Sequence, residues 1–152
     1  MKSFISIIIL SVILTNCGFK PIYKTKNNNF EIVEIINKNE NKNSFAIEKL
    51  ITSLSNQNAV KKIKLELNYK QTFSTILKDS KGDPSKKKLS ITVNLVVKNE
   101  QDNVLINKNF NEEFSYSVQS NKFNMAQYEE NITSNLNNKI SNDIIFLLGT
   151  LK

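Results

Sequence analysis

Two segments in which apolar and polar residues alternate constrain this fold more than any other feature. In residues 62–70 the apolar positions are Ile63, Leu65, Leu67 and Tyr69. In residues 89–98 they are Leu89, Ile91, Val93, Leu95 and Val97. Since successive side chains of a strand point to opposite faces, this period of two predicts two antiparallel strands. Each would lie with one face on a core and the other in water.

A strand and a helix are predicted before these two segments. Residues 30–37 are rich in β-branched side chains and favour a strand. Ser44 can cap a helix that runs to about Gln57. Four residues of that helix share one face at helical spacing, and they are Ile47, Leu50, Ile51 and Leu54.

The connections and the fourth strand follow from turn residues and alternation. Residues 78–88 contain Gly82 and Pro84, and we interpret them as a loop. Residues 99–103 predict a turn into a strand over 104–118. One face of that strand is mostly apolar, and we assign its aromatic residues Phe110, Phe114 and Tyr116 to the core.

A long helix is predicted over residues 124–148. Its apolar row advances in steps of four through Tyr128, Ile132, Leu136, Ile140, Ile144 and Leu148. Each step turns the helix by about 400°, so the row drifts by about 40° a step. One straight helix on a flat surface could not bury both ends of such a row. We therefore expect a bend or break near Asn137 and Asn138, where helix propensity is weak.

The resulting order, β-α-β-β-β-α, predicts a single α+β domain over residues 30–152. The simplest packing is a two-layer sandwich, in which two helices cover one face of a four-stranded, mainly antiparallel sheet. The other sheet face should stay wet or meet a polar partner, because it carries Lys62, Lys64, Lys70, Asn94 and Asn107.

The N-terminus has the layout of an export signal. Lys2 precedes an apolar run from Phe4 to Leu14, which is too short to span a bilayer and ends close to Cys17, the single cysteine. The sequence Leu-Thr-Asn-Cys looks like a bacterial lipobox. This predicts a signal peptide over residues 1–16, a lipid on Cys17 and a tether over 17–29. The alternative is an ordinary signal peptide with an incidental cysteine.

Composition argues against most catalytic chemistry and suggests anionic partners. The chain has no histidine, which excludes nucleophile pairs such as Ser-His and Cys-His. All 21 basic residues are lysine, and the net charge is +7. Lysines in the predicted 78–88 loop are candidate anion contacts, or alternatively keep a loop soluble. The candidates are Lys81, Lys86, Lys87 and Lys88.

Several motifs resemble a known family. The segment from Cys17 to Tyr23, CGFKPIY, is similar to the CGFxPLY start of mature lipopolysaccharide-assembly lipoproteins, the LptE family. The strand end Phe114-Ser115-Tyr116, followed by Phe123-Asn124-Met125-Ala126 and a long helix, is similar to the last strand and closing helix of that family. The β-α-β-β-β-α order also agrees.

The resemblance implies a function in the bacterial envelope. It implies an outer-membrane lipoprotein that faces the periplasm, plugs the β-barrel LptD and helps to deliver lipopolysaccharide (LPS) to the cell surface. It implies LPS binding, no enzymatic activity and no cofactor beyond the lipid on Cys17, such as palmitate. We hypothesise that LPS phosphates meet Lys81, Lys86, Lys87 and Lys88.

Three other readings remain open at this point. The first is a structural outer-membrane lipoprotein that scaffolds another envelope complex. The second is an envelope enzyme, although adjacent carboxylates such as Glu112-Glu113 and Glu129-Glu130 point apart in regular structure. The third is a basic nucleic-acid binder, which would require residues 1–16 to remain attached.

Overall fold

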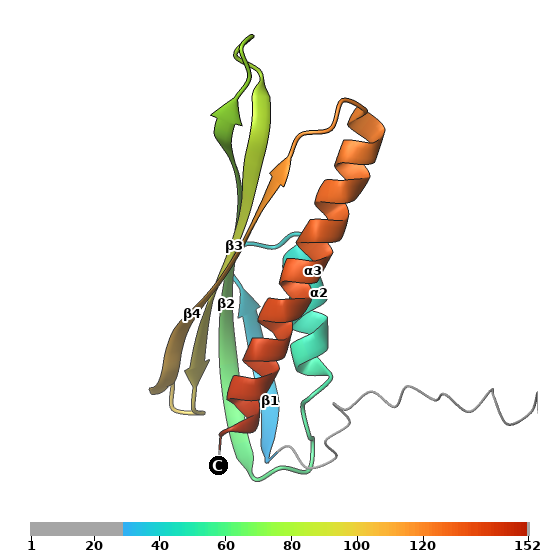
Figure 1. The fold of residues 1–152 in the computed structure, drawn as a ribbon. Coiled ribbons are helices and arrows are strands. Elements are labelled where there is room, and N and C mark those ends of the chain that lie inside the picture. Colours follow the sequence, from blue (N-terminus) through green and yellow to red (C-terminus); the bar gives the residue numbers. More distant parts are fainter. Residues whose placement is uncertain (1–28, 152) are drawn as a thin grey trace, which may run out of the picture.

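The computed structural model describes residues 29–151, so the predicted signal peptide, Cys17 and nearly all of the tether lie outside the described residues. The described chain has six elements in a β-α-β-β-β-α order, which can be followed in Figure 1. They are β1 (Phe30–Asn37), α2 (Lys42–Thr52), β2 (Lys61–Lys78), β3 (Pro84–Lys98), β4 (Val104–Ser117) and α3 (Lys122–Gly149).

The elements form the predicted two-layer α+β architecture. The sheet has the order β1-β2-β3-β4, in which β1 is parallel to β2 and the other pairs are antiparallel. Helix α2 provides the crossover that a parallel β1–β2 pair requires. Both helices lie on the same side of the sheet (Figure 1), which confirms the predicted fold class.

The start and end of α2 differ from the prediction. The N-cap is Asn41 rather than Ser44, and its side chain accepts hydrogen bonds from the backbone N–H groups of Asn43 and Ser44, each at 3.0 Å. The Ser44 hydroxyl accepts from the Asn41 N–H at 2.9 Å, which completes a capping box. The helix ends at Thr52, and Ser55 beyond it accepts a hydrogen bond from the Ile32 N–H of β1.

Strands β2 and β3 are longer than predicted, and the expected loop over residues 78–88 is wrong. Only residues 79–83 form the turn, where Asp79 Oδ1 accepts from the N–H groups of Lys81 and Asp83 at 2.9 Å each. Gly82 has a φ of 88°, a backbone conformation that favours glycine. Pro84 is the first residue of β3, a position where a strand tolerates proline.

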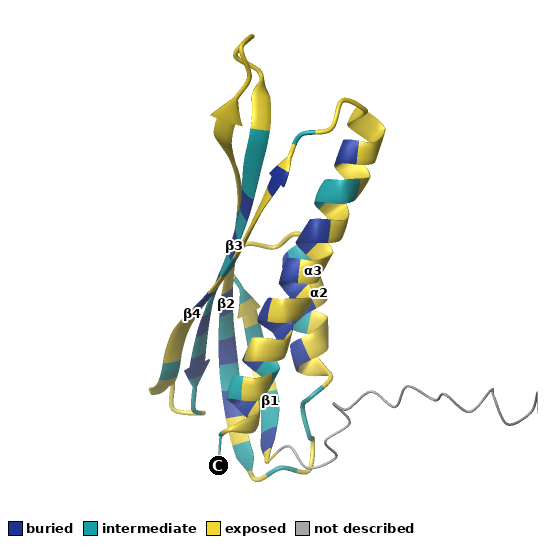
Figure 2. Cartoon of the chain, viewed as in Figure 1, coloured by how far each residue is buried: buried dark blue, intermediate teal, exposed yellow. Residues whose placement is uncertain are grey.

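The core lies between the sheet and the two helices, as the buried residues in Figure 2 show. The alternating residues of β2 and β3 supply its sheet side, from Ile63 to Tyr69 and from Leu89 to Val97. The helices supply its other side. Helix α2 contributes Ile47 and Ile51, and α3 contributes six apolar residues, which are Met125, Ile132, Leu136, Ile140, Ile144 and Leu148.

The predicted break in the last helix is also wrong. Helix α3 continues through Asn137 and Asn138, and Figure 1 shows it as one straight rod. The sheet beneath it is twisted, so a drifting apolar row can remain in contact along the whole helix. Asn137 itself is buried, and its Oδ1 accepts a hydrogen bond from the Tyr69 hydroxyl at 3.2 Å.

The other sheet face is polar and no described element covers it, as predicted. Side chains of β3 and β4 bond across the strands there. Asn94 donates to Asn107 at 2.9 Å and to Asn109 at 2.8 Å, and Thr92 donates to Asn111 at 3.0 Å. Within residues 29–151, no helix is both long and apolar enough to cross a membrane.

Candidate functional site

The β2–β3 hairpin projects beyond the part of the sheet that the helices cover. Figure 1 shows its tip standing apart from the N-terminal end of α3, and Figure 2 shows that the tip is exposed. Every residue from Thr72 to Ser85 is exposed. The strand pairing continues to the turn, so this exposed region is regular backbone rather than loop.

Three large apolar side chains lie in this exposed region. Phe73 is 47% exposed, Ile76 44% and Leu77 56%. The β2–β3 register shifts on both sides of Leu77, and such bulges redirect side chains. We call Phe73, Ile76 and Leu77 together with Lys78, Lys81 and Lys86 the hairpin surface. It covers both faces of the hairpin, because Phe73 pairs with Leu89 on the helix side and Leu77 pairs with Lys86 on the open face. Its apolar half was not among the predicted site residues, although the run of β-branched and aromatic residues over 72–77 indicates a strand.

The four predicted anion contacts do not form one cluster. Lys81 lies in the turn, whereas Lys86, Lys87 and Lys88 are consecutive residues of β3. Side chains alternate along a strand, so Lys87 lies on the helix side while Lys86 and Lys88 lie on the open face. The sequence identified charged positions here, but a loop in which all four could converge does not exist.

Lys87 connects the hairpin to α3. Its Nζ lies 3.3 Å from Glu129 Oε1, which also accepts a hydrogen bond from the Tyr116 hydroxyl at 2.6 Å. Burial, and then the Glu129 carboxylate, raise the pKa of Tyr116. The Tyr116 ring packs edge-on against Tyr128, with centroids 5.9 Å apart. Lys87 is therefore part of the fold rather than an available cation.

Lys88 is also engaged, on the opposite face. Its Nζ lies 3.1 Å from Glu113 Oε2, and this contact, with a hydrogen bond from the Ser90 hydroxyl, lowers the pKa of Glu113. By contrast, among residues 29–151 neither Lys81 nor Lys86 has a carboxylate oxygen within 4.0 Å. The same holds for Lys78, so the available cations of the hairpin surface are Lys78, Lys81 and Lys86.

The aromatic residues of β4 divide between the core and the surface. Phe110 and Tyr116 are buried, as predicted, but Phe114 is 43% exposed, so its assignment to the core is wrong. Phe114 pairs with Leu89 of β3, which in turn pairs with Phe73 of β2. The central Leu89 is covered on both sides, whereas Phe114 belongs to an edge strand with no described neighbour beyond it.

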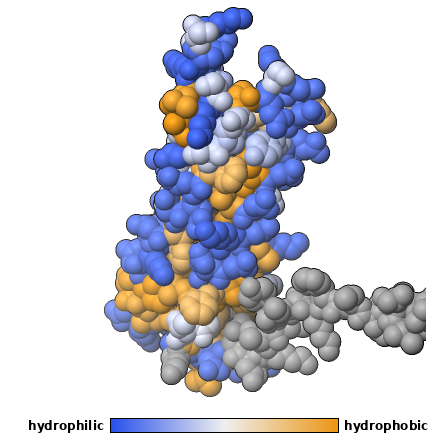
Figure 3. Space-filling model, viewed as in Figure 1, coloured by the Kyte–Doolittle hydropathy of each residue, from blue (hydrophilic) through white to orange (hydrophobic). Residues whose placement is uncertain are grey.

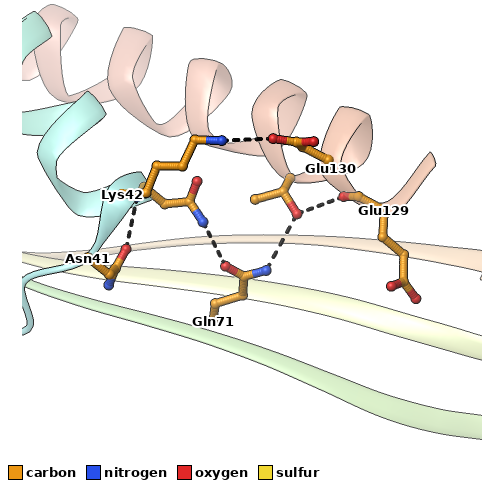
Figure 4. A network of polar contacts seen from close by, with 7 residues as sticks. Asn41, Lys42, Gln71, Glu129 and Glu130 are labelled. Carbon is orange, nitrogen blue, oxygen red and sulfur yellow. Dashed lines mark hydrogen bonds and ion pairs between the residues drawn. The ribbon is translucent and has the colours of Figure 1, made fainter. Parts of the chain in front are cut away.

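A polar network joins the base of the hairpin to both helices (Figure 4). Gln71 accepts a hydrogen bond from Asn43 of α2 at 3.0 Å and donates to Thr133 of α3 at 3.4 Å. The Thr133 hydroxyl donates to the Glu129 carbonyl at 2.7 Å, and Lys42 pairs with Glu130 at 2.8 Å. The network marks the level at which the apolar core gives way to the projecting hairpin.

Within the described part of the chain, His, Cys, Asp and Glu form no group of three or more that could hold a metal ion. The adjacent carboxylates named above pair with separate lysines. Glu112 pairs with Lys139 at 2.7 Å, while Glu113, Glu129 and Glu130 pair with the lysines already described.

Several solved structures of bacterial lipoproteins have a similar fold. Rare lipoprotein B from Shewanella oneidensis is 13% identical, with a TM-score of 0.59 over 77% of this chain and 91% of its own. Lipoprotein B from Nitrosomonas europaea is 12% identical, with a TM-score of 0.60 over 84% and 88%. A minor lipoprotein from Acinetobacter baumannii is 12% identical, with a TM-score of 0.58 over 81% and 92%.

These similarities establish a shared fold across most of each chain. No protein-family model matches the sequence, and no curated protein sequence matches it. At such low identity the similarity is one of fold.

Proposed function

We propose that this protein is an outer-membrane lipoprotein, anchored through a lipid on Cys17, that plugs an LptD-type β-barrel and assists LPS transport to the cell surface. In this proposal it faces the periplasm, acts without catalysis and needs no cofactor beyond its lipid. It binds LPS through the hairpin surface. The observation that carries the proposal is the combination of exposed apolar and cationic side chains on one projecting hairpin.

The chemistry of the hairpin surface suits an anionic amphiphile. Phe73, Ile76 and Leu77 offer apolar contact area to acyl chains. Lys81 and Lys86 offer positive charge to phosphate groups without first breaking an ion pair with a described carboxylate. LPS combines acyl chains and phosphates in one molecule, so it matches both halves of this surface.

The open sheet face is suited to the proposed role as a barrel plug. Barrel interiors are polar, and a protein that fills one needs a polar exterior. The cross-strand bonds of Asn94 and Thr92 satisfy polar groups of this face, on which β3 contributes Val96 among polar and charged neighbours. The shared fold with bacterial lipoproteins supports the envelope location.

The first test measures LPS binding to the lipidated protein in detergent. Replacing Lys81 and Lys86 with alanine should weaken binding roughly tenfold at low salt and reduce its salt dependence. Replacing Lys49 and Lys62 removes the same charge from exposed positions outside the hairpin and should leave affinity nearly unchanged. Equal effects of the two variants would contradict binding at the hairpin.

The second test asks which partner the protein joins. Affinity purification from detergent-solubilised envelopes should recover a large β-barrel together with the protein. Recovery of a different envelope complex, combined with no affinity for LPS, would instead favour a structural scaffold.

A further inference from the structure

Strand β4 presents a long unpaired edge. It spans Val104–Ser117 and pairs with β3 alone among the described strands. Figure 1 shows the lower end of β4 standing away from the lower end of α3, so the helix does not screen this part of the edge. An edge with unpaired N–H and C=O groups is a template for a further strand.

The face of β4 that points toward the helices has a self-complementary sequence. Its residues in order are Ile106, Lys108, Phe110, Glu112 and Phe114. Suppose that two copies of β4 pair antiparallel, with Phe110 of one opposite Phe110 of the other. Lys108 of each copy then lies opposite Glu112 of the other, and Ile106 of each lies opposite Phe114 of the other. Opposite charges and apolar pairs directly across a strand pair are both stabilising.

Registers centred on residues near Phe110 also keep all helices on one side of the joined sheet, but they do not pair these charged and apolar residues favourably. Centring on Lys108 or on Glu112 would set like charges opposite each other, which is destabilising. Centring on Asn109 or Asn111 would set Lys108 or Glu112 opposite an apolar residue. In the register about Phe110, the open face sets Asn109 opposite Asn111, so no charge is left facing a like charge.

At this edge Lys108 is a cation without an ion-pair partner among residues 29–151. Lys108 Nζ lies 5.1 Å from the centre of the Phe110 ring and, within residues 29–151, has no carboxylate oxygen within 4.0 Å. Glu112 is held in place by Lys139 at 2.7 Å and can accept a second cation. A lysine from a second copy would reach a carboxylate that is already positioned.

Apolar surface surrounds the same edge. A groove between β4 and the last turns of α3 is lined in part by Phe110, Leu147 and Phe146, which is 77% exposed. Val104 and Leu105 at the start of β4 are also exposed. Figure 3 shows an apolar patch at the lower left, at the end of the molecule where β4 begins.

We propose that the partner of this edge is a second copy of the chain. Two β4 strands pair antiparallel about Phe110, which joins two four-stranded sheets into one continuous sheet with all helices on the same side. Pairing satisfies both edges at once and brings Phe114 and Ile106 into contact across the interface. The dimer is a state of the protein outside a barrel, because a plug inside a barrel has no space for a second copy. Its test does not rest on the proposed function.

A charge exchange tests both the dimer and its register. The lipidated protein is studied in density-matched detergent by sedimentation, and the unchanged chain should form dimers. Lys108→Glu and Glu112→Lys each set like charges opposite each other and should raise the dimer dissociation constant roughly tenfold or more. An equal mixture of the two variants restores both opposite-charge pairs and should form mixed dimers as tightly as the unchanged protein.

Three results would overturn the proposal: an unchanged chain that remains monomeric, single variants that dimerise normally, or a mixture that stays monomeric. Circular dichroism checks that each variant folds, since Glu112→Lys also loses its contact with Lys139. Two chains could also sediment together only because their lipid anchors share a micelle. All samples carry the same anchor, so a difference between the single variants and their mixture cannot come from the micelle.

Cross-linking provides an independent test that does not disturb the charged pairs. Asn109 and Asn111 are exposed on the open face and would stand opposite each other. Under copper-catalysed oxidation, a mixture of Asn109→Cys and Asn111→Cys chains should form a disulfide-linked dimer. Each variant alone should resemble the unchanged chain, and equal cross-linking of single and mixed samples would contradict this register.

Discussion

At the scale of single residues, two lysines strongly lower the pKa of Glu66. Its carboxylate lies 2.7 Å from Lys38 Nζ and also accepts a hydrogen bond from Lys98. These contacts lower the pKa of Glu66 from an ordinary 4.5 to about 2, with Lys38 contributing first. The stabilisation they provide therefore exists while the carboxylate is ionised in both the folded and the unfolded chain.

The variant Glu66→Gln should lose this pH-dependent part of the stability. Because the pKa is depressed in the folded state, the unchanged protein gains the full benefit above about pH 5 and loses it as the pH falls toward about 2. Denaturant unfolding at several pH values should show the difference between the two proteins shrinking on acidification.

Glu40→Gln is the matched control for that experiment. Glu40 is exposed and forms no ion pair with a described residue, so its replacement removes one charge without removing these contacts. A Glu66→Gln difference that stays constant between pH 6 and pH 2 would contradict the assigned cause.

At the scale of elements, the start of α3 depends on a single cap. Asn121 accepts hydrogen bonds from the N–H groups of Phe123 at 3.0 Å and Asn124 at 3.1 Å. Asn121→Ala should lower the free energy of unfolding by about 1 kcal/mol. Asn124→Ala, one turn later on an exposed face, should cause no loss because alanine favours helix. Thermal or chemical unfolding of both variants measures the contrast.

The elements that sequence predicted best are those with one buried face. Burial forces the alternation of Ile63 to Tyr69, and that alternation is readable without a structure. The outer half of the hairpin is exposed on both faces, so no alternation marks it and its extent was missed. The expected break at Asn137 was wrong because a tertiary hydrogen bond from Tyr69 compensates for weak helix propensity.

At the scale of the whole molecule, the two layers are joined by polar contacts as well as by the core. The Tyr69 hydroxyl lies 3.2 Å from both Asn137 Oδ1 and Gln71 Oε1, which share its one proton, and burial raises the pKa of Tyr69 to about 12. Tyr69→Phe leaves the buried Asn137 oxygen without this donor. It should lower the free energy of unfolding by about 1–2 kcal/mol.

Tyr128→Phe is the control for that variant. The Tyr128 ring packs against Tyr116, but its hydroxyl forms no hydrogen bond with a described residue, so its removal should change stability little. Comparable losses in urea unfolding for both variants would show that the Tyr69 hydroxyl has no special part in holding the layers together.

The candidate site was predictable in composition but not in arrangement. Sequence identified Lys81, Lys86, Lys87 and Lys88, yet strand alternation sends the last three to different faces and two of them into ion pairs. Which of these lysines lie on the same face depends on where β3 begins, and the number of charges in the sequence does not give that. The lipid attachment predicted at Cys17 lies outside the described residues and stays a prediction.

The parallel pairing of β1 with β2 has a mechanical consequence. Both strands begin at the same end of the sheet, and β1 is the first element of the described chain. A pull on the chain ahead of Phe30, directed away from that end, would act along the strand and load all β1–β2 hydrogen bonds in shear together. The domain would thus resist tension from its N-terminal side better than a hairpin that opens one bond at a time.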